Sequence, residues 1–126
     1  MNNSIFDLTN PQKAIWLTEQ FYQGTNVNNI CAILYLEEKI NFDLLKKALN
    51  VLVKTNDNFR IKLVMKNNVV KQFISEYEFI DIPVINVNSK KDVLNLQKQI
   101  VLQPFSLLDS LLFNFTIFKY PNNRNR

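Results

Sequence analysis

The sequence predicts an α+β fold in which helices pack on a mixed and mostly antiparallel sheet. Three segments carry apolar residues at the three- and four-residue spacing of a helix, and several others alternate with the two-residue spacing of a strand. Strong helix-start signals precede the helical segments. With 126 residues, 47% of them hydrophobic and 12% aromatic, the chain can form one small domain or one lobe with a packed core.

The first helix is expected to begin at Thr9 or Asn10. Thr9 could cap it with Gln12 closing a capping box, or Asn10 could cap it with Pro11 in the first helical position. Gly24, the only glycine, is a typical helix stop. The apolar stripe between these signals consists of Ala14, Ile15, Thr18, Phe21 and Tyr22.

Residues 30–36 are apolar on both alternating faces, which predicts a central strand covered on two sides. Cys31, the only cysteine, lies in this run, so no internal disulfide is possible. We expect it to be a small buried hydrophobe and not a nucleophile.

A second helix followed by a hairpin is expected in the middle of the chain. Asn41 is placed to cap the helix. Residues 59–65 then alternate, residues 66–68 form a turn candidate, and residues 69–74 return as a second strand. The helix stripe has the spacing i, i+3, i+4, i+7, i+8 and consists of Leu45, Ala48, Leu49, Leu52 and Val53.

The last third of the chain predicts a strand, a helix and a strand. Residues 80–87 fit a short edge strand because Pro83 lacks a backbone donor. Ser89 with Asp92 opens a third helix, whose buried stripe is Val93, Leu96, Ile100 and Val101 and whose limit is Pro104. Residues 111–120 alternate as a last strand. The expected order is therefore α-β-α-β-β-(β)-α-β.

Composition excludes several kinds of chemistry. The chain has no histidine and one cysteine, so it holds no serine–histidine or cysteine–histidine nucleophile and no plausible zinc site. One glycine excludes a P-loop and a dinucleotide-binding glycine motif. Acidic residues at 37–38, 76 and 78 sit near expected strand ends, where solvated carboxylates are ordinary.

Charge and hydropathy give no sign of nucleic-acid or membrane binding. The net charge is +4, but the lysines are scattered and no recognised nucleic-acid motif accompanies them. No apolar run approaches the ~20 residues that cross a bilayer, and the first residues do not form a secretory signal. A cytoplasmic location is the expectation.

Three segments carry recognisable short motifs. Residues 8–16 contain a motif that consists of a capping Thr9, then Gln12, then the Ile15–Trp16 pair. Pro11 stands where such a motif usually has alanine, and Ala14 where it usually has arginine or glycine. Residues 55–63 are compared with a basic-His-Glu-x-Leu-Arg-Thr-x-Phe motif. Arg60 is identical to the arginine of that motif, and Asp57 and Phe59 are conservative replacements of its Glu and Leu. The motif is not followed at Thr55, Asn56 and Ile61. Residues 103–107 and 111–115 supply Pro104 and Phe105 and then a strand in which Asn114 replaces a frequent arginine.

In their order and spacing over residues 8–120, these motifs resemble the N-terminal lobe of the condensation domain of nonribosomal peptide synthetases. The resemblance implies a fold like chloramphenicol acetyltransferase, in which two lobes enclose a tunnel. There, thioesters carried on phosphopantetheine by carrier proteins meet to form an amide bond. Two histidines of a His-His-x-x-x-Asp-Gly motif stand beside that tunnel.

This sequence lacks the histidine motif, so the resemblance implies that residues 1–126 are a single scaffold lobe that ends before it. We therefore expect no catalytic residue, no metal and no directly bound cofactor in this chain, and no activity of the chain alone. The implied partners are the remainder of the condensation domain and its carrier-protein domains.

The resemblance implies that Arg60 supports the active-site motif by pairing with its aspartate. Because that aspartate is absent here, we expect Arg60 to be exposed, repositioned or paired with another carboxylate. The alternative is a solvated charge on an edge strand. Gln12 is expected to cap its helix, and Trp16 to pack in the core instead of contacting a ligand.

Two other interpretations stay open. The chain could belong to another CoA- or carrier-dependent acyltransferase or to an epimerisation domain, or it could be a small interaction module that binds a protein. An unpaired sheet edge would in addition predict self-association.

Overall fold

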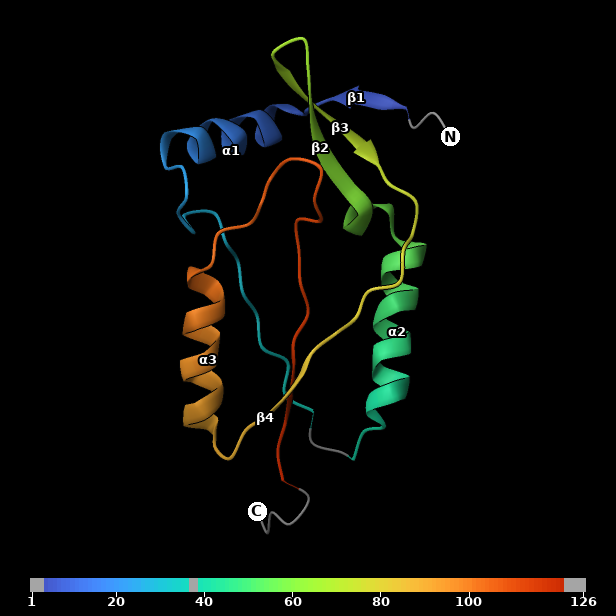
Figure 1. The fold of residues 1–126 in the computed structure, drawn as a ribbon, viewed down its shortest axis with the longest axis vertical. Coiled ribbons are helices and arrows are strands. Elements are labelled where there is room, and N and C mark those ends of the chain that lie inside the picture. The colour runs from blue at the N-terminus through green and yellow to red at the C-terminus, as the bar shows by residue number, and fades with distance from the viewer. Residues whose placement is uncertain (1–3, 37–38, 122–126) are drawn as a thin grey trace.

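The computed structural model describes residues 4–36 and 39–121 (Figure 1). In chain order, its elements are β1 (Ile5–Asp7), α1 (Asn10–Phe21), α2 (Phe42–Thr55), the 3₁₀ turn η1 (Asp57–Arg60), β2 (Ile61–Lys66), β3 (Val69–Ile74), β4 (Val84–Asn86), α3 (Lys90–Leu102) and β5 (Ile117–Lys119).

The predicted α+β class is confirmed, and the described residues form two small sheets. One is antiparallel with the strand order β1-β3-β2, and the other is the parallel pair β4-β5. In Figure 1, α2 and α3 flank the extended middle segments on opposite sides, and α1 lies beside the β2–β3 hairpin. The fold therefore has its hairpin at one end and its parallel pair at the other.

All three helix starts follow the predicted caps. Of the two alternatives for α1, the structure has Thr9 as the cap, with Gln12 completing the capping box. The side chain of Asn41 accepts a hydrogen bond from the backbone N–H of Leu44. Ser89 and Asp92 form the second capping box, at the start of α3.

Replacing Thr9 with alanine is expected to lower the free energy of unfolding by about 1 kcal/mol, because the first turn of α1 loses an acceptor for its free N–H groups. Denaturant titration followed by circular dichroism measures this change. Ser106→Ala, at an exposed position outside any helix, is the control and should have almost no effect. Equal effects of the two substitutions would contradict the capping role.

The β2–β3 hairpin is confirmed in its register and its turn. Lys66 pairs with Val69 at the turn, and Ile61 pairs with Ile74 at the open end. Asn67 and Asn68 adopt φ values of 51° and 64°, the left-handed conformation that a two-residue turn of this kind requires and that asparagine tolerates.

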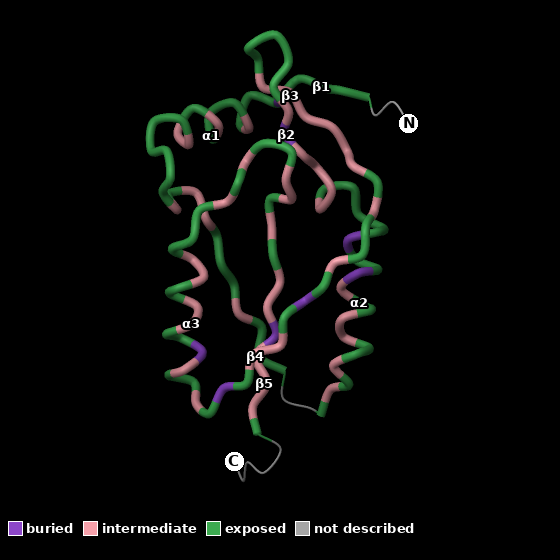
Figure 2. The backbone as a smooth tube through the Cα atoms, viewed as in Figure 1, coloured by how far each residue is buried: buried purple, intermediate pink, exposed green. Residues whose placement is uncertain are grey.

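The core is small and lies between the helices and the middle segments (Figure 2). Val53 on α2, Val93 on α3 and Ile82 in the segment before β4 are the most deeply buried large side chains. The buried apolar side chains are Leu8, Val53, Leu63, Ile82, Val87, Val93 and Ile117.

The prediction of a central strand at residues 30–36 is wrong. This segment is not part of any sheet, and Ile30 and Leu34 are 97% and 82% exposed. Cys31 is exposed as well, so the expectation that it is buried fails with the strand. A continuous apolar run favours a buried strand, but a strand also needs a neighbour to pair with, and no described segment pairs with this one.

Other strands are shorter than expected, and one was missed. The 80–87 strand is reduced to β4, and the 111–120 strand to β5, which pair with each other. Residues 59 and 60 belong to η1 instead of a strand. The three-residue strand β1, which pairs with β3, is too short to show a periodic pattern.

The predicted stripe of α2 is rotated. Ala48 and Leu52 are exposed, whereas Asn50 is buried together with Val53.

No helix in the described part of the chain has the length and apolar character that a membrane span requires.

Candidate functional site

The start of α1 is tied to the antiparallel sheet through Gln12. Its side-chain Oε1 accepts from the Thr9 backbone N–H at 2.8 Å, which confirms the predicted capping role. Its Nε2 donates to Gln72 Oε1 on β3 at 2.8 Å, and Gln72 Nε2 donates to the backbone oxygen of Asp7 at 2.9 Å. One amide therefore caps the helix and fixes it against β3.

The remaining residues of this first motif lie on α1. Trp16 is half-buried, and Ile15 is 53% exposed. Trp16 is therefore not part of the fully buried core, and its expected packing role stays a prediction.

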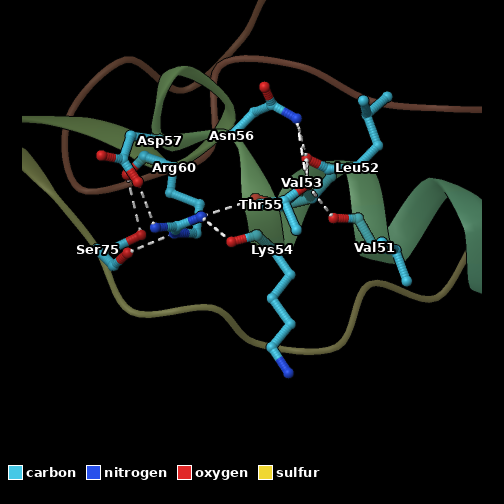
Figure 3. Close-up of polar contacts among 9 residues, drawn as sticks. All are labelled: Val51, Leu52, Val53, Lys54, Thr55, Asn56, Asp57, Arg60 and Ser75. Atoms are coloured by element: carbon cyan, nitrogen blue, oxygen red, sulfur yellow. Dashed lines mark hydrogen bonds and ion pairs between the residues drawn. The ribbon is translucent and has the colours of Figure 1, made fainter.

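Arg60 stands at the junction of α2, η1 and the end of β3, and Figure 3 shows its contacts. Its Nη1 donates to the backbone oxygens of Val53 at 2.8 Å and Lys54 at 2.6 Å. Its Nε donates to the backbone oxygen of Ser75 at 3.0 Å. These carbonyls include two from the last turn of α2, which have no partners inside the helix and carry the negative end of its dipole.

The fourth contact of Arg60 is with a carboxylate. Its Nη2 pairs with Asp57 Oδ1 at 2.7 Å, and the arginine side chain is 14% exposed whereas that of Asp57 is 65% exposed. Of the three outcomes expected for Arg60, the structure has the third, a pair with another carboxylate, and the side chain is not exposed. Its role toward that motif stays a prediction.

Ser75 closes the junction from the other side. Its backbone N–H and its Oγ both donate to the Arg60 backbone oxygen, at 2.9 and 3.0 Å. Because Arg60 Nε donates to the Ser75 oxygen, three hydrogen bonds join these two residues. We call this arrangement of Arg60, Asp57, Ser75 and the end of α2 the arginine junction.

A cleft of about 330 Å³ opens next to the arginine junction. The Phe59 ring forms one wall and packs edge-on against Phe113, with ring centroids 5.2 Å apart, and Phe115 lies behind it at 6.0 Å. The cleft is mainly apolar and carries no charged side chain in its lining, which consists of Gln12, Asn58, Phe59, Ile61, Leu112 and Phe113.

The structure therefore brings residues from all three motif segments together, because Gln12, Phe59 and Phe113 line one cleft. Asp57 and Arg60 stand beside this cleft. Pro104 is exposed just beyond α3, and Phe105 is half-buried there.

A buried polar network around Asn50 was missed from the sequence. Asn50 is 5% exposed, and its Nδ2 donates to the backbone oxygens of Lys46 and Ile80, each at 3.0 Å. Its Oδ1 accepts from the Ile80 N–H at 2.8 Å and from the Tyr77 hydroxyl at 2.9 Å. The only sequence signal for this network was that Asn50 directly follows Leu49, a residue of the predicted apolar stripe of α2.

Lys71 on β3 anchors β1 through an ion pair with Asp7. The hydrogen bond from Lys71, and then its charge, hold the pKa of Asp7 below its ordinary value of 3.8. Such a carboxyl stabilises the fold above its unfolded pKa, and this stabilisation is lost as the pH falls through the lower, folded-state pKa.

We expect wild type to melt at a slightly higher temperature than Asp7→Asn at neutral pH, and this difference to vanish as the pH falls below 3.8. The effect is small because Asp7 is exposed. Thermal melts at a series of pH values measure it, with Asp81→Asn as an exposed control. A difference that grows in acid would contradict the assignment.

Comparison with known families matches residues 2–126 to the family described as Condensation domain. The chain belongs to the condensation-domain family.

Among the described residues, no group of three or more histidine, cysteine, aspartate or glutamate side chains is placed to hold a metal ion.

Two curated relatives are similar to this condensation-domain chain along nearly its whole length. Surfactin synthase subunit 1 of Bacillus subtilis (strain 168) is 29% identical over 130 residues, and a Plipastatin synthase from the same organism is 27% identical over 123 residues. The matches cover 98% and 94% of the chain but only 4% and 5% of the two synthases. The chain thus spans a small part of each relative.

Solved condensation domains share its fold. The starter condensation domain of rhizomide synthetase RzmA matches with a TM-score of 0.84 and 21% identity, over 94% of this chain and 30% of that one. The condensation domain of the Monacolin K polyketide synthase MokA matches with a TM-score of 0.74 and 14% identity, over 94% and 27%. These matches confirm the predicted fold.

Proposed function

We propose that this chain is the N-terminal scaffold lobe of a condensation domain that joins two carrier-protein-bound aminoacyl or peptidyl thioesters through an amide bond. The observation that carries the proposal is the family match across residues 2–126. It is supported by the arginine junction and the apolar cleft, which bring the motif residues to one end of the fold.

In this proposal the chain contributes support and not proton transfer. It contains no histidine, so the imidazole that would orient or deprotonate the acceptor amine comes from another part of the enzyme. The chain alone is therefore inactive. Its partners are the remainder of the condensation domain and cytoplasmic carrier proteins whose phosphopantetheine arms bring the substrates.

Arg60 is the positioning residue in this scheme. A guanidinium presents five N–H donors in a fixed fork, and the four contacts described above leave one Nη2 hydrogen. Asp57 is exposed, so it can yield to the aspartate of a histidine motif without leaving a buried charge unpaired. The other contacts of Arg60 would keep the guanidinium in place during this exchange.

The test is an assay of the purified chain with a donor and an acceptor thioester, each loaded on its carrier protein. Mass spectrometry detects the amide product on the acceptor carrier. We expect no product beyond that of a reaction without the chain. Time-dependent amide formation by the chain alone would overturn the proposed role.

A further inference from the structure

Ser75 lies where the β2–β3 hairpin meets the arginine junction. It follows the last residue of β3, and Arg60 precedes the first residue of β2. The register of the hairpin ends with Ile61 opposite Ile74, so Arg60 and Ser75 occupy the next pair of positions along the two segments. Ser75 lies outside all three motif segments, and the sequence gave no reason to single it out.

Arg60 and Ser75 are joined as a pair of strand residues is, with one change. Two opposed residues of antiparallel strands commonly exchange two hydrogen bonds, each from a backbone N–H to a backbone oxygen. Here the Ser75 N–H donates to the Arg60 oxygen at 2.9 Å, but the bond to the Ser75 oxygen comes from the arginine side chain, whose Nε donates at 3.0 Å (Figure 3). The direction of the guanidinium is therefore tied to the register of the hairpin.

The hydroxyl of Ser75 reinforces this pair. Its Oγ donates to the same Arg60 oxygen at 3.0 Å, beside the bond from the Ser75 N–H. A carbonyl oxygen has two lone pairs, and both are used here. The backbone from which the Arg60 side chain extends is therefore held by two donors of one residue.

The hydrogen bond from Nε determines how the guanidinium plane is turned. The group is planar, so its N–H bonds lie in one plane, and the bond from Nε together with those from Nη1 to the end of α2 fixes that plane. Asp57 contributes less to this orientation, because its side chain is 65% exposed and accepts only from Nη2. Ser75 and the end of α2 thus hold the guanidinium from two sides.

We propose that Ser75 is a positioning residue, which holds the Arg60 guanidinium in the orientation that receives the aspartate of the histidine motif. This inference rests on the proposed function, because it requires Arg60 to support that motif. In this scheme Ser75 acts only through Arg60 and does not touch the substrates. Its hydroxyl should therefore change the rate of amide formation and not the binding of the carrier proteins.

The first experiment follows the Arg60 side chain in the chain itself. NMR on an isotope-labelled sample measures how fast the Arg60 Nε hydrogen exchanges with water. We expect Ser75→Ala to raise this rate about fivefold, the effect of losing roughly one hydrogen bond. Ser75→Thr keeps a hydroxyl and should retain the wild-type rate, as should the control Ser106→Ala at an exposed position. An unchanged rate in Ser75→Ala, or a threonine variant that behaves like the alanine variant, overturns the proposal.

The second experiment measures amide formation by a fusion of this chain to the sequence that follows the matched segment in Surfactin synthase subunit 1. We expect Ser75→Ala to lower kcat about fivefold, again the effect of roughly one hydrogen bond. The KM for each carrier-loaded thioester should stay unchanged, and Ser75→Thr should keep the wild-type kcat. An effect of Ser75→Ala on KM alone overturns the proposal, because it would assign Ser75 to carrier binding.

The variant Arg60→Lys in the same fusion distinguishes this inference from the proposed function, once circular dichroism has shown that each variant is folded. If Arg60→Lys lowers kcat and Ser75→Ala does not, Ser75 is not a positioning residue and the proposed function stands. If neither substitution lowers kcat, or if the fusion forms no amide, the proposed role of Arg60 fails and this inference fails with it.

Discussion

Replacing Arg60 with alanine is expected to lower the free energy of unfolding by about 2–4 kcal/mol. The variant leaves the oxygens of Val53, Lys54 and Ser75 without their donor. It thereby removes both the cap of the last turn of α2 and the link between α2 and β3. Denaturant unfolding followed by circular dichroism gives the free-energy change.

Two further variants separate the parts of the arginine junction. Asp57→Asn should cost no more than about 1 kcal/mol, because its carboxylate is largely exposed. Arg60→Lys should fall between the two, since an ammonium keeps the charge but cannot reproduce the planar fork. If Arg60→Ala lowered the free energy of unfolding no more than Asp57→Asn does, the hydrogen bonds from Arg60 to the helix carbonyls would not contribute to stability.

Replacing Asn50 with alanine is expected to cost about 2–4 kcal/mol, because it leaves buried polar groups without partners. The N–H and the oxygen of Ile80 both bond to this one amide. Their loss should release the segment before β4 from α2. The same unfolding measurement applies, with hydrogen exchange at the Ile80 N–H as a local readout that should show faster exchange.

Controls for Asn50 exist in the same chain. Tyr77→Phe removes one of the four hydrogen bonds and should cost about 1 kcal/mol. Asn95→Ala, at an exposed position of α3, should have almost no effect. An Asn50→Ala variant as stable as Asn95→Ala would show that the network contributes nothing.

Local signals predicted the parts of the fold that depend on neighbouring residues. Thr9 with Gln12 and Ser89 with Asp92 form capping boxes, and Asn67 and Asn68 form the hairpin turn, because each motif is completed within four residues. The three motif segments, in residues 8–16, 55–63 and 103–115, also led to the correct family, since their order along the chain is itself a sequence property.

Features that depend on distant partners were not predictable in this way. Residues 30–36 form a continuous apolar run and residues 111–116 alternate, and both patterns are typical of strands, but no ladder forms along them among the residues that the structure describes. Phe113 instead packs its ring on Phe59. Similarly, the hydrogen bond from Asn50 to Ile80 joins residues 30 positions apart, and the sequence around Asn50 does not indicate that Ile80 is its partner.

Under the proposed function, this chain is a supporting lobe of an amide-forming condensation domain whose histidines lie outside residues 1–126. The most direct measurement joins the chain to the sequence that follows the matched segment in Surfactin synthase subunit 1. Carrier-loaded thioesters are then supplied and the amide is detected by mass spectrometry. We expect amide formation by the fusion and its loss when the histidines of the added part are replaced. A fusion that folds, as judged by circular dichroism, yet forms no amide would contradict the claim.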